Sequence, residues 1–442
     1  MSTAVDARPI DKLVFFGWWS VMALLPLGHL TGLRNTWTVL VVIGTLVWLG
    51  RDAWRGLAAR VPLVLLLLWC AASIAWSTTP AISFGKWQTD LLIPLLAYAA
   101  AFGYVRRTGS LVPVVGGLMT GMGLLMLISL TAVLPTSLMI AVSTFVSMED
   151  FPNIAGPMPI WYPGVGDASM AASLSAAILV CAPRLMPRVA GAWWWAGWAA
   201  LIAIVVASNN RNAALAIPIV ALLAWLWMRR LSKKAVGPWS RTRWGVSILG
   251  AALLSVSLIA ALETSARERL RIIGEPVAAD RSGLVVLTER DTRPMIWAYY
   301  LKLAIRSPII GVGFGRTVPG IHYRTQDDRA LARIEFNAYI HAHNLFLNWW
   351  LQTGVIGVAL LIAVLVAIVT RASRCRRRTS DPRAVAAWVA ICALLVAMLI
   401  RDATDDLLVY GMATMFWVLI GCVAGLVERY AMNDTLTAPR FP

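Results

Sequence analysis

Apolar runs of about 17 to 25 residues, separated by short polar segments, follow one another along most of the chain. Runs of this length match the hydrocarbon core of a bilayer, whereas a membrane β-barrel would show alternating segments of about ten residues. The pattern predicts an all-α polytopic membrane protein with about twelve transmembrane helices. The expected spans are 13–33, 36–50, 61–77, 88–105, 111–134, 166–184, 189–207, 211–228, 245–263, 344–370, 384–400 and 409–428.

The polar segments divide the chain into regions. Residues 1–263 hold nine spans joined mostly by short loops, residues 344–430 hold the last three, and residues 431–442 form a tail. Between the two sets of spans, residues 264–343 form the one long polar segment, which is expected to be a large and mainly helical loop. Residues 135–165 are rich in proline and aromatic side chains, and we expect a re-entrant or surface segment there. This segment fits either the wall of a cavity or a packed plug.

Positive charge predicts the orientation of the spans. The chain has 39 Lys and Arg residues and a net charge of +17. On the side of the two termini lie 23 of the 39, against 4 in the short loops of the opposite side. Because short basic loops stay in the cytoplasm, we expect both termini there and the long loop on the opposite side of the membrane. The basic runs are explained by topology, so no nucleic-acid partner is expected. The five cysteines form neither a zinc spacing nor an external disulfide framework.

Two histidines stand where the long polar segment meets an apolar run. If a single helix includes both, His343 lies on one line with Gly354 and Gly357, and His341 points the opposite way. The two histidines are therefore expected to have different roles. The glycines would let a neighbouring helix or lipid chain approach closely, and Asn344 offers a donor and an acceptor that could orient the ring or a substrate.

Several cationic residues are expected at the same membrane surface. Arg211 follows the polar run Ser-Asn-Asn at the start of the eighth span, and Arg269, Arg290 and Arg293 lie in the long loop. Lys86 is an isolated external lysine beside a tryptophan. One guanidinium can donate two parallel hydrogen bonds to phosphate oxygens, so this set of residues suits a diphosphate ligand. The alternative is a structural role, with Lys86 as an interfacial anchor and the arginines extending to the membrane surface.

The acidic residues allow two interpretations. Glu289 and Asp291 form an acid-x-acid pattern of the kind that binds metal, but the neighbouring arginines would compete with a cation, so ion pairing is favoured and no metal site is expected. A second acidic group lies in the short turn before the last span and comprises Asp402, Asp405 and Asp406. These carboxylates are expected to pair with Arg401 or other external arginines, and a catalytic carboxylate is the alternative.

The spacing around His343 resembles a known family. His343-Asn344, nine further residues and then Gly354-Val-Ile-Gly357 resemble the pattern of the O-antigen ligases (WaaL). Upstream, two further segments are similar to conserved parts of the wider O-antigen ligase and polymerase superfamily. They are Arg293-x-x-x-Trp297 with the glycine-rich stretch 307–315, and the polar turn 208–211 with its arginine.

The resemblance implies a GT-C-like glycosyltransferase architecture and a specific reaction. A polysaccharide would be transferred from undecaprenyl diphosphate to a sugar hydroxyl of lipid A–core at the periplasmic face, without ATP, metal or any other cofactor. Histidine is the side chain that accepts a proton near pH 7, so His343 is the expected base. The residues expected to hold the diphosphate are Arg211, Arg293, Arg290, Lys86 and Arg269, and those expected to support the site are Asn344, Gly354 and Gly357.

Other functions stay open at this stage. A Wzy-type polymerase would use the same donor with a lipid-linked glycan as acceptor, and a protein O-oligosaccharyltransferase is a more distant alternative. A polysaccharide or lipid transporter would also have many spans, but transporters usually place ionisable groups at mid-membrane and show internal repeats. A purely structural role for His343, as a link between helices, is the alternative to catalysis.

Overall fold

The computed structural model describes residues 9–27, 31–131, 165–187, 192–208, 210–231, 292–324 and 341–437, with isolated positions between 260 and 286. Every regular element in this part of the chain is helical. The α-helices are α1 (Pro9–Leu24), α2 (Thr31–Leu49), α3 (Arg60–Ala72), α4 (Pro80–Lys86), α5 (Ile93–Thr108), α6 (Val112–Thr131), α8 (Val165–Leu185), α9 (Ala192–Ser208), α10 (Arg211–Leu231), α13 (Arg293–Arg306), α14 (Val318–Arg324), α16 (Leu345–Arg376), α17 (Pro382–Asp402) and α18 (Tyr410–Thr437). Shorter helical turns are η1 (Gly50–Ala53), η2 (Ser73–Trp76) and the π-helix η3 (Trp87–Leu92).

Seven stretches in the described residues are long and apolar enough to cross a membrane: Thr31–Ala53, Pro80–Thr108, Gly166–Leu185, Asn212–Leu231, Leu345–Arg376, Pro382–Asp402 and Tyr410–Asp434. Three shorter apolar helices, Arg60–Trp76, Val112–Leu127 and Trp193–Val205, coincide with further predicted spans. The polytopic all-α class is therefore confirmed. The number of twelve crossings and the periplasmic side of the long loop stay predictions, because the predicted span 245–263 lies almost wholly outside the described residues.

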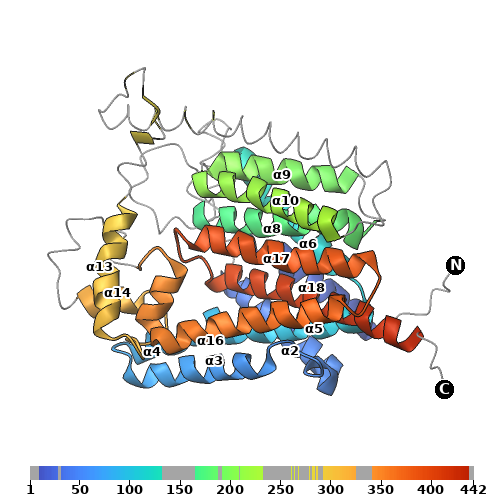
Figure 1. Ribbon diagram of the computed structural model, residues 1–442, viewed down its shortest axis with the longest axis horizontal. Coiled ribbons are helices and arrows are strands. Elements are labelled where there is room, and N and C mark those ends of the chain that lie inside the picture. Colours follow the sequence, from blue (N-terminus) through green and yellow to red (C-terminus); the bar gives the residue numbers. More distant parts are fainter. Residues whose placement is uncertain are drawn as a thin grey trace.

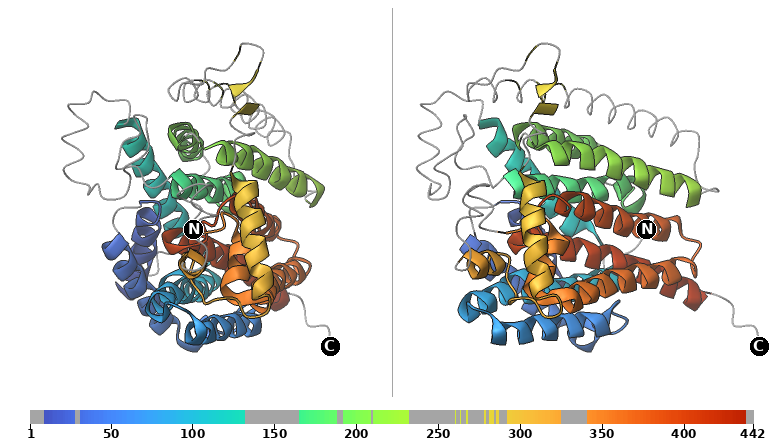
Figure 2. Two further views of the ribbon diagram at one scale, coloured as in Figure 1. Left: turned by 90° about the vertical axis from the view of Figure 1, so that its left-hand side faces the viewer. Right: turned by 60° about the vertical axis from the view of Figure 1, so that its left-hand side comes forward.

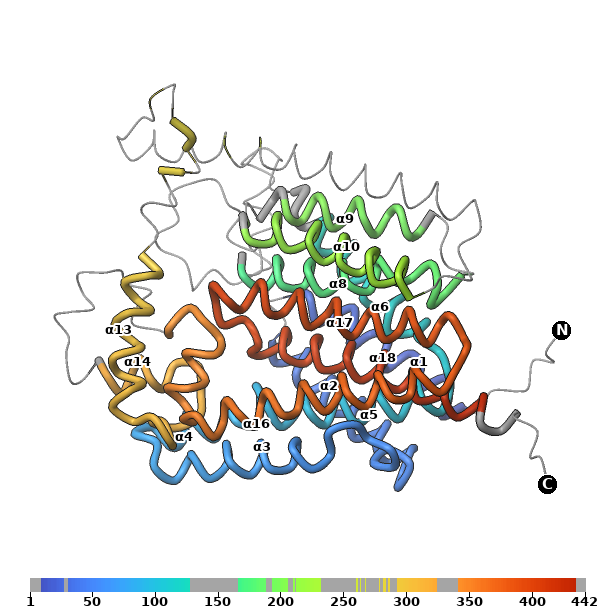
Figure 3. The backbone as a smooth tube through the Cα atoms, in the orientation of Figure 1, coloured from blue at the N-terminus to red at the C-terminus, as the bar shows by residue number. Residues whose placement is uncertain are grey.

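The long helices lie side by side in one bundle (Figures 1 and 3), and glycines allow some of them to pack closely. Helix α18 packs along α5, where Cβ atoms added at Gly421 and Gly425 would lie 2.5 Å from the carbonyl oxygen of Tyr98 and 2.4 Å from that of Phe102. Only glycine permits backbones to approach so closely. This contact fixes the middle of α18 against α5.

Two short helices cover one end of the bundle. Figure 2 shows α13 crossing this end at a steep angle to the long helices, with α14 beside it. The buried face of α13 holds Ile296 and Tyr300, which share a small apolar core with Val318 of α14 and Leu351 of α16. As the sequence predicted, α13 has a proline in its first turn, at position 294, and runs to Arg306 without an interior breaker. Helices α16 and α18 begin at this end, and α17 finishes there.

Candidate active site

The two histidines lie in a non-helical segment before α16, and not on the helix. Helix α16 begins at Leu345, with Asn344 as its N-cap. The backbone nitrogen of His343 lies 3.0 Å from Nδ1 of His341, and the two ring centroids are 4.0 Å apart. The prediction that His341 points away from His343 is therefore wrong, because it assumed that the helix already includes both residues. Both imidazoles belong to one site.

The side chains of Asn344 and Trp297 hold this segment in place. The Asn344 Oδ1 accepts the backbone N–H of Leu347 at 3.0 Å, and its Nδ2 donates to the carbonyl of Ala403 at 2.9 Å. This is a side-chain helix cap that also holds the loop between α17 and α18. Asn344 thus places His343 through the backbone, whose φ of +48° lies in the left-handed region. The indole N–H of Trp297 in α13 donates to the His343 carbonyl at 3.2 Å and holds this residue from a second helix.

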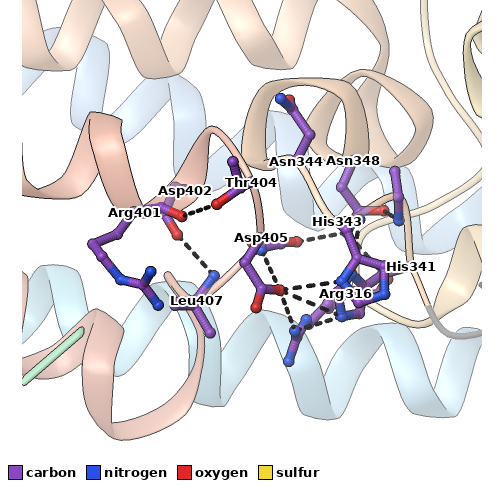
Figure 4. Close-up of polar contacts among 12 residues, drawn as sticks. Arg316, His341, His343, Asn344, Asn348, Arg401, Asp402, Thr404, Asp405 and Leu407 are labelled. Carbon is purple, nitrogen blue, oxygen red and sulfur yellow. Dashed lines mark hydrogen bonds and ion pairs between the residues drawn. The ribbon is translucent and has the colours of Figure 1, made fainter. Parts of the chain in front are cut away.

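Asp405 is the centre of the site (Figure 4). Its Oδ1 lies 3.5 Å from Nδ1 of His343 and 3.8 Å from Nε2 of His341. Arg316 completes the cluster, since its Nη2 donates to the same oxygen at 3.3 Å and lies 2.5 Å from His341 Nε2. The side chains of Arg316, His343 and Asp405 are each about one-fifth exposed, at 20%, 18% and 22%. The cluster is therefore partly open at the end of the bundle, while His341 is buried.

Electrostatics favour an ionised Asp405 and a neutral His341. Although burial raises the pKa of Asp405, the close contacts with His343 and Arg316 hold it below the ordinary aspartate value. Burial, together with the positive Arg316, lowers the pKa of His341 well below the usual histidine range. Asp406 differs, because burial raises its pKa to about 6. Its Oδ2 accepts from Nδ2 of Asn348 at 2.6 Å. The pKa values of the adjacent carboxyl groups of Asp405 and Asp406 are therefore shifted in opposite directions.

Three of these groups have the chemistry of metal ligands. One donor atom from each of His341, His343 and Asp405 lies within 4.8 Å of the others. Two histidines and a carboxylate are a common ligand set for divalent ions. However, the guanidinium of Arg316 contacts His341 and Asp405 directly, and it supplies positive charge where a metal would.

The glycine motif lies in α16 and forms a kink beside the glycine-rich turn 307–315. In α16 the backbone leaves the helix at Gly354, with φ +69° and ψ −176°. The glycine-rich turn 307–315 fits into this kink, since the N–H of Val312 and Gly313 donate to the carbonyls of Leu351 and Gln352 at 2.9 Å each. The glycines were predicted to admit a helix or lipid. At Gly354 the close neighbour is instead this turn, and a Cβ at Gly357 would meet the side chain of Thr353.

Lys86 lies beside the cluster at the junction of α4 and η3. Its Nζ donates to the hydroxyl of Tyr410 and stands 4.0 Å above that ring. The stem of Lys86 packs near Gly315, the residue before Arg316. The backbone N–H of Tyr410 donates to Asp90 of η3 at 3.2 Å. A π-helical turn of this kind is often found at functional sites, and here it places Asp90 against the start of α18.

Arg211 opens α10, whose first residues are tied to the loop that carries Asp405. Asn210 accepts from Arg401 Nη1 at 3.1 Å, and Asn212 donates to Thr404 Oγ1 at 2.5 Å. Arg293 is the first residue of α13, at the same end of the bundle. The backbone of Arg211 is thus brought toward the site, and its side chain lies outside the described residues. Arg269, Arg290, Glu289 and Asp291 also lie outside them.

Sequence reasoning missed Arg316, gave His341 no catalytic role and offered a catalytic carboxylate in the turn of Asp405 only as the alternative to ion pairing. Arg316 directly follows the glycine-rich turn, and this position was its only sequence signal. The acidic turn was expected to pair with Arg401 or with another arginine of the long segment, and Asp405 pairs with such an arginine, Arg316. Arg401 is buried and instead donates to Ser169 and Asn210.

Part of the chain matches a known protein family. Residues 196–362 match the family model described as O-antigen ligase. The matched region includes α10, α13, Arg316, both histidines and the kink at Gly354, whereas Lys86 and Asp405 lie outside it. This match supports membership of the O-antigen ligase and polymerase superfamily. No curated protein matches the chain.

Proposed function

We propose that the chain is an O-antigen ligase, because residues 196–362 match the family model of that description and support membership of the O-antigen ligase and polymerase superfamily. It would transfer O-antigen polysaccharide from undecaprenyl diphosphate to a sugar hydroxyl of lipid A–core. The observation that carries the proposal is the contact between His343 Nδ1 and Asp405 Oδ1 in a partly open cluster at the end of the bundle. A histidine held by a carboxylate is a suitable general base for a hydroxyl nucleophile.

In the proposed reaction the acceptor oxygen attacks the anomeric carbon of the donor sugar. The bond from that carbon to the diphosphate oxygen breaks, and the diphosphate leaves with the bonding electrons. Nε2 of His343 takes the hydroxyl proton, because Nδ1 faces Asp405. Asp405 then stabilises the imidazolium that forms. Both groups are within the cluster, so no large movement of the protein is required for the proton transfer.

The leaving diphosphate needs positive charge. We assign this role to Arg211 and Arg293, with Lys86, Arg269 and Arg290 as further contacts. Support comes from the bundle end, where α10 and α13 begin close to the loop of Asp405. Guanidinium donors placed at developing negative charge are each worth about 2.7 to 4 kcal/mol of the barrier. With this charge supplied by side chains, the reaction is proposed to need neither metal nor ATP.

The orientation in the membrane follows from the other end of the bundle. Helix α5 finishes there with Arg106 and Arg107, and α16 finishes with Arg374 and Arg376. Basic residues concentrated at one end mark the cytoplasmic face by the positive-inside rule. We therefore assign the cluster to the periplasmic face of the bacterial inner membrane, with both termini in the cytoplasm.

The test is glycan transfer by the purified chain with lipid-linked glycan as donor. Two acceptors are compared, lipid A–core and a second molecule of lipid-linked glycan. A ligase forms product only with lipid A–core, whereas product only with the second glycan would identify a polymerase. Substrate flux into vesicles without covalent product would identify a transporter.

The residue assignment is tested in the same assay with His343→Ala. We expect transfer to fall by at least about 10²-fold, the usual contribution of a general base. His322→Ala is the matched control, since His322 lies in α14 outside the cluster. Full activity of the His343 variant at equal expression would remove the base assignment.

A further inference from the structure

The three ligand-like side chains in the cluster converge on one place. Donor atoms around a tetrahedral zinc ion at 2.0 to 2.1 Å lie about 3.3 Å from one another. Here Asp405 Oδ1 is 3.5 Å from His343 Nδ1 and 3.8 Å from His341 Nε2. Small movements of three side chains would therefore complete a two-histidine, one-carboxylate metal site. A negative carboxylate beside two imidazole nitrogens favours a cation at this place.

Arg316 already supplies that cation. Its Nη2 lies between the imidazole nitrogen of His341 and the carboxylate oxygen of Asp405, at 2.5 Å and 3.3 Å. A guanidinium has only donors and stays protonated, so it can satisfy acceptor atoms but cannot itself bind a metal. The cluster thus has its positive charge from the chain.

The backbone holds Arg316 in this position. Its carbonyl accepts from Nδ2 of Asn348 at 3.2 Å, and the preceding N–H, that of Gly315, donates to Oε1 of Gln352 at 2.8 Å. Both partners are buried residues of the first turns of α16, the helix that follows the histidines. The backbone of Arg316 is therefore fixed relative to the imidazoles, and its side chain is only 20% exposed.

We propose that Arg316 is the resident cation of this site, occupying the place that a divalent metal takes in a two-histidine, one-carboxylate centre. Arg316 excludes metal and holds the carboxylate of Asp405 in position for His343. This makes Arg316 a positioning residue, whose effect reaches the substrate through Asp405 and His343. The part of the inference that concerns catalysis rests on the proposed function, whereas the exclusion of metal does not.

Cobalt binding tests the exclusion independently of activity. Co²⁺ is titrated into the purified full-length chain and followed by its visible absorption, which reports ligation by histidine. We expect no such band for the natural chain or for Arg316→Lys, which keeps a positive charge. Arg316→Gln removes the charge at similar size, and we expect it to bind one Co²⁺ at least 100-fold more tightly than the natural chain.

Two controls locate the bound ion. The double variant Arg316→Gln, Asp405→Asn should lose the new band, because it lacks the carboxylate ligand. The double variant Arg316→Gln, His322→Ala should keep it, because His322 is not in the cluster. Co²⁺ binding by the natural chain at these residues, or its absence in a folded Arg316→Gln variant, would overturn the proposal.

Transfer activity tests the positioning role separately. In Arg316→Gln we expect kcat to fall by at least tenfold with KM for the lipid-linked donor changed less than threefold, and guanidinium ion added to the assay to restore part of kcat. A structural defect would not respond to guanidinium. If the proposed function fails, no variant shows transfer but the Co²⁺ results stand. If only the positioning role fails, the Arg316→Gln variant stays fully active.

Discussion

Gly354 lies directly against Ile309, and a Cβ at position 354 would come within 1.9 Å of the carbonyl oxygen of Ile309. The backbone at this glycine, with φ +69° and ψ −176°, is in a region that only glycine occupies readily. The kink frees the carbonyl of Thr353, which accepts the indole N–H of Trp69 at 2.9 Å. One glycine thus joins α16, α3 and the glycine-rich turn that leads to Arg316.

Gly354→Ala should therefore destabilise the fold. The backbone strain and the clash with Ile309 together are expected to lower the free energy of unfolding by at least about 3 kcal/mol. Thermal unfolding of the detergent-purified variant measures this. Gly44→Ala is the matched control, because Gly44 is an exposed helical position with no atom within 4 Å of the added Cβ. Equal unfolding temperatures for the two variants would contradict the structural role of the kink.

Asp405→Asn should reduce transfer while leaving the fold intact. The amide keeps the size of the side chain but removes the negative charge that faces His343 and Arg316. We expect kcat to fall by about 10²- to 10³-fold, since an imidazolium formed during the reaction loses its counter-charge. Asp52→Asn is a suitable control, because Asp52 is an exposed residue of η1 that pairs only with Arg55 among the described residues. A kcat within threefold of the natural chain would separate Asp405 from catalysis.

Asp406 should make stability depend on pH in the opposite sense from Asp405. The unfolded chain releases the Asp406 proton near the ordinary value of 3.8, while burial raises the folded pKa to about 6. Between these values the folded state binds more protons, so this group's contribution to stability falls as pH rises from 4 to 6. A difference of two pKa units corresponds to roughly 3 kcal/mol, and the loss is complete by pH 7.

Asp406→Asn isolates this contribution. The amide oxygen can still accept from Asn348. The change removes the titratable group, whose pKa also depends on the charges of Arg316, Asp405 and Asp90. We expect the unfolding temperature of the variant to rise relative to the natural chain as pH increases from 4 to 7. Parallel pH profiles for the two proteins would show that Asp406 does not titrate in this range.

Local sequence signals predicted much of the fold. Apolar length gave most of the long helices, and the proline at 294 with an uninterrupted run to Arg306 gave α13. The orientation of His341 was predicted wrongly because the helix was started too early. Asn344 carried the correcting signal, since asparagine before an apolar run is a preferred N-cap and places both histidines outside the helix.

The cluster itself could not be predicted from local patterns. Arg316 is one of many basic residues in the long polar segment, and its partners His341 and Asp405 are 25 and 89 residues away. Arg316 reaches these partners because the turn at 307–315 fits the kink of α16, and that fit is a tertiary contact. Similarly, nothing in the turn before α18 distinguishes Asp405 from Asp402 until their different neighbours are known.

Arg401 should control how well the donor is held, although it is buried and far from solvent. Its Nη2 donates to Ser169 Oγ at 2.7 Å and its Nη1 to Asn210 Oδ1, so it joins α17 to α8 and to the residue before Arg211. Arg401→Met keeps the volume but loses both bonds. Hydrogen bonds to a charged donor contribute about 1.5 to 3 kcal/mol, so a displaced Arg211 should raise KM for the lipid-linked donor by roughly 10- to 100-fold.

The change in kcat should be much smaller, because the proton acceptor and Asp405 stay in place. Asn212→Ala is the matched control, since it removes one bond from the same helix end to Thr404 and leaves the Arg401 contacts. Its KM should therefore rise less than that of Arg401→Met. A fall in kcat without a change in KM would place Arg401 with the proton-transfer groups and would contradict its assignment to the donor side of the site.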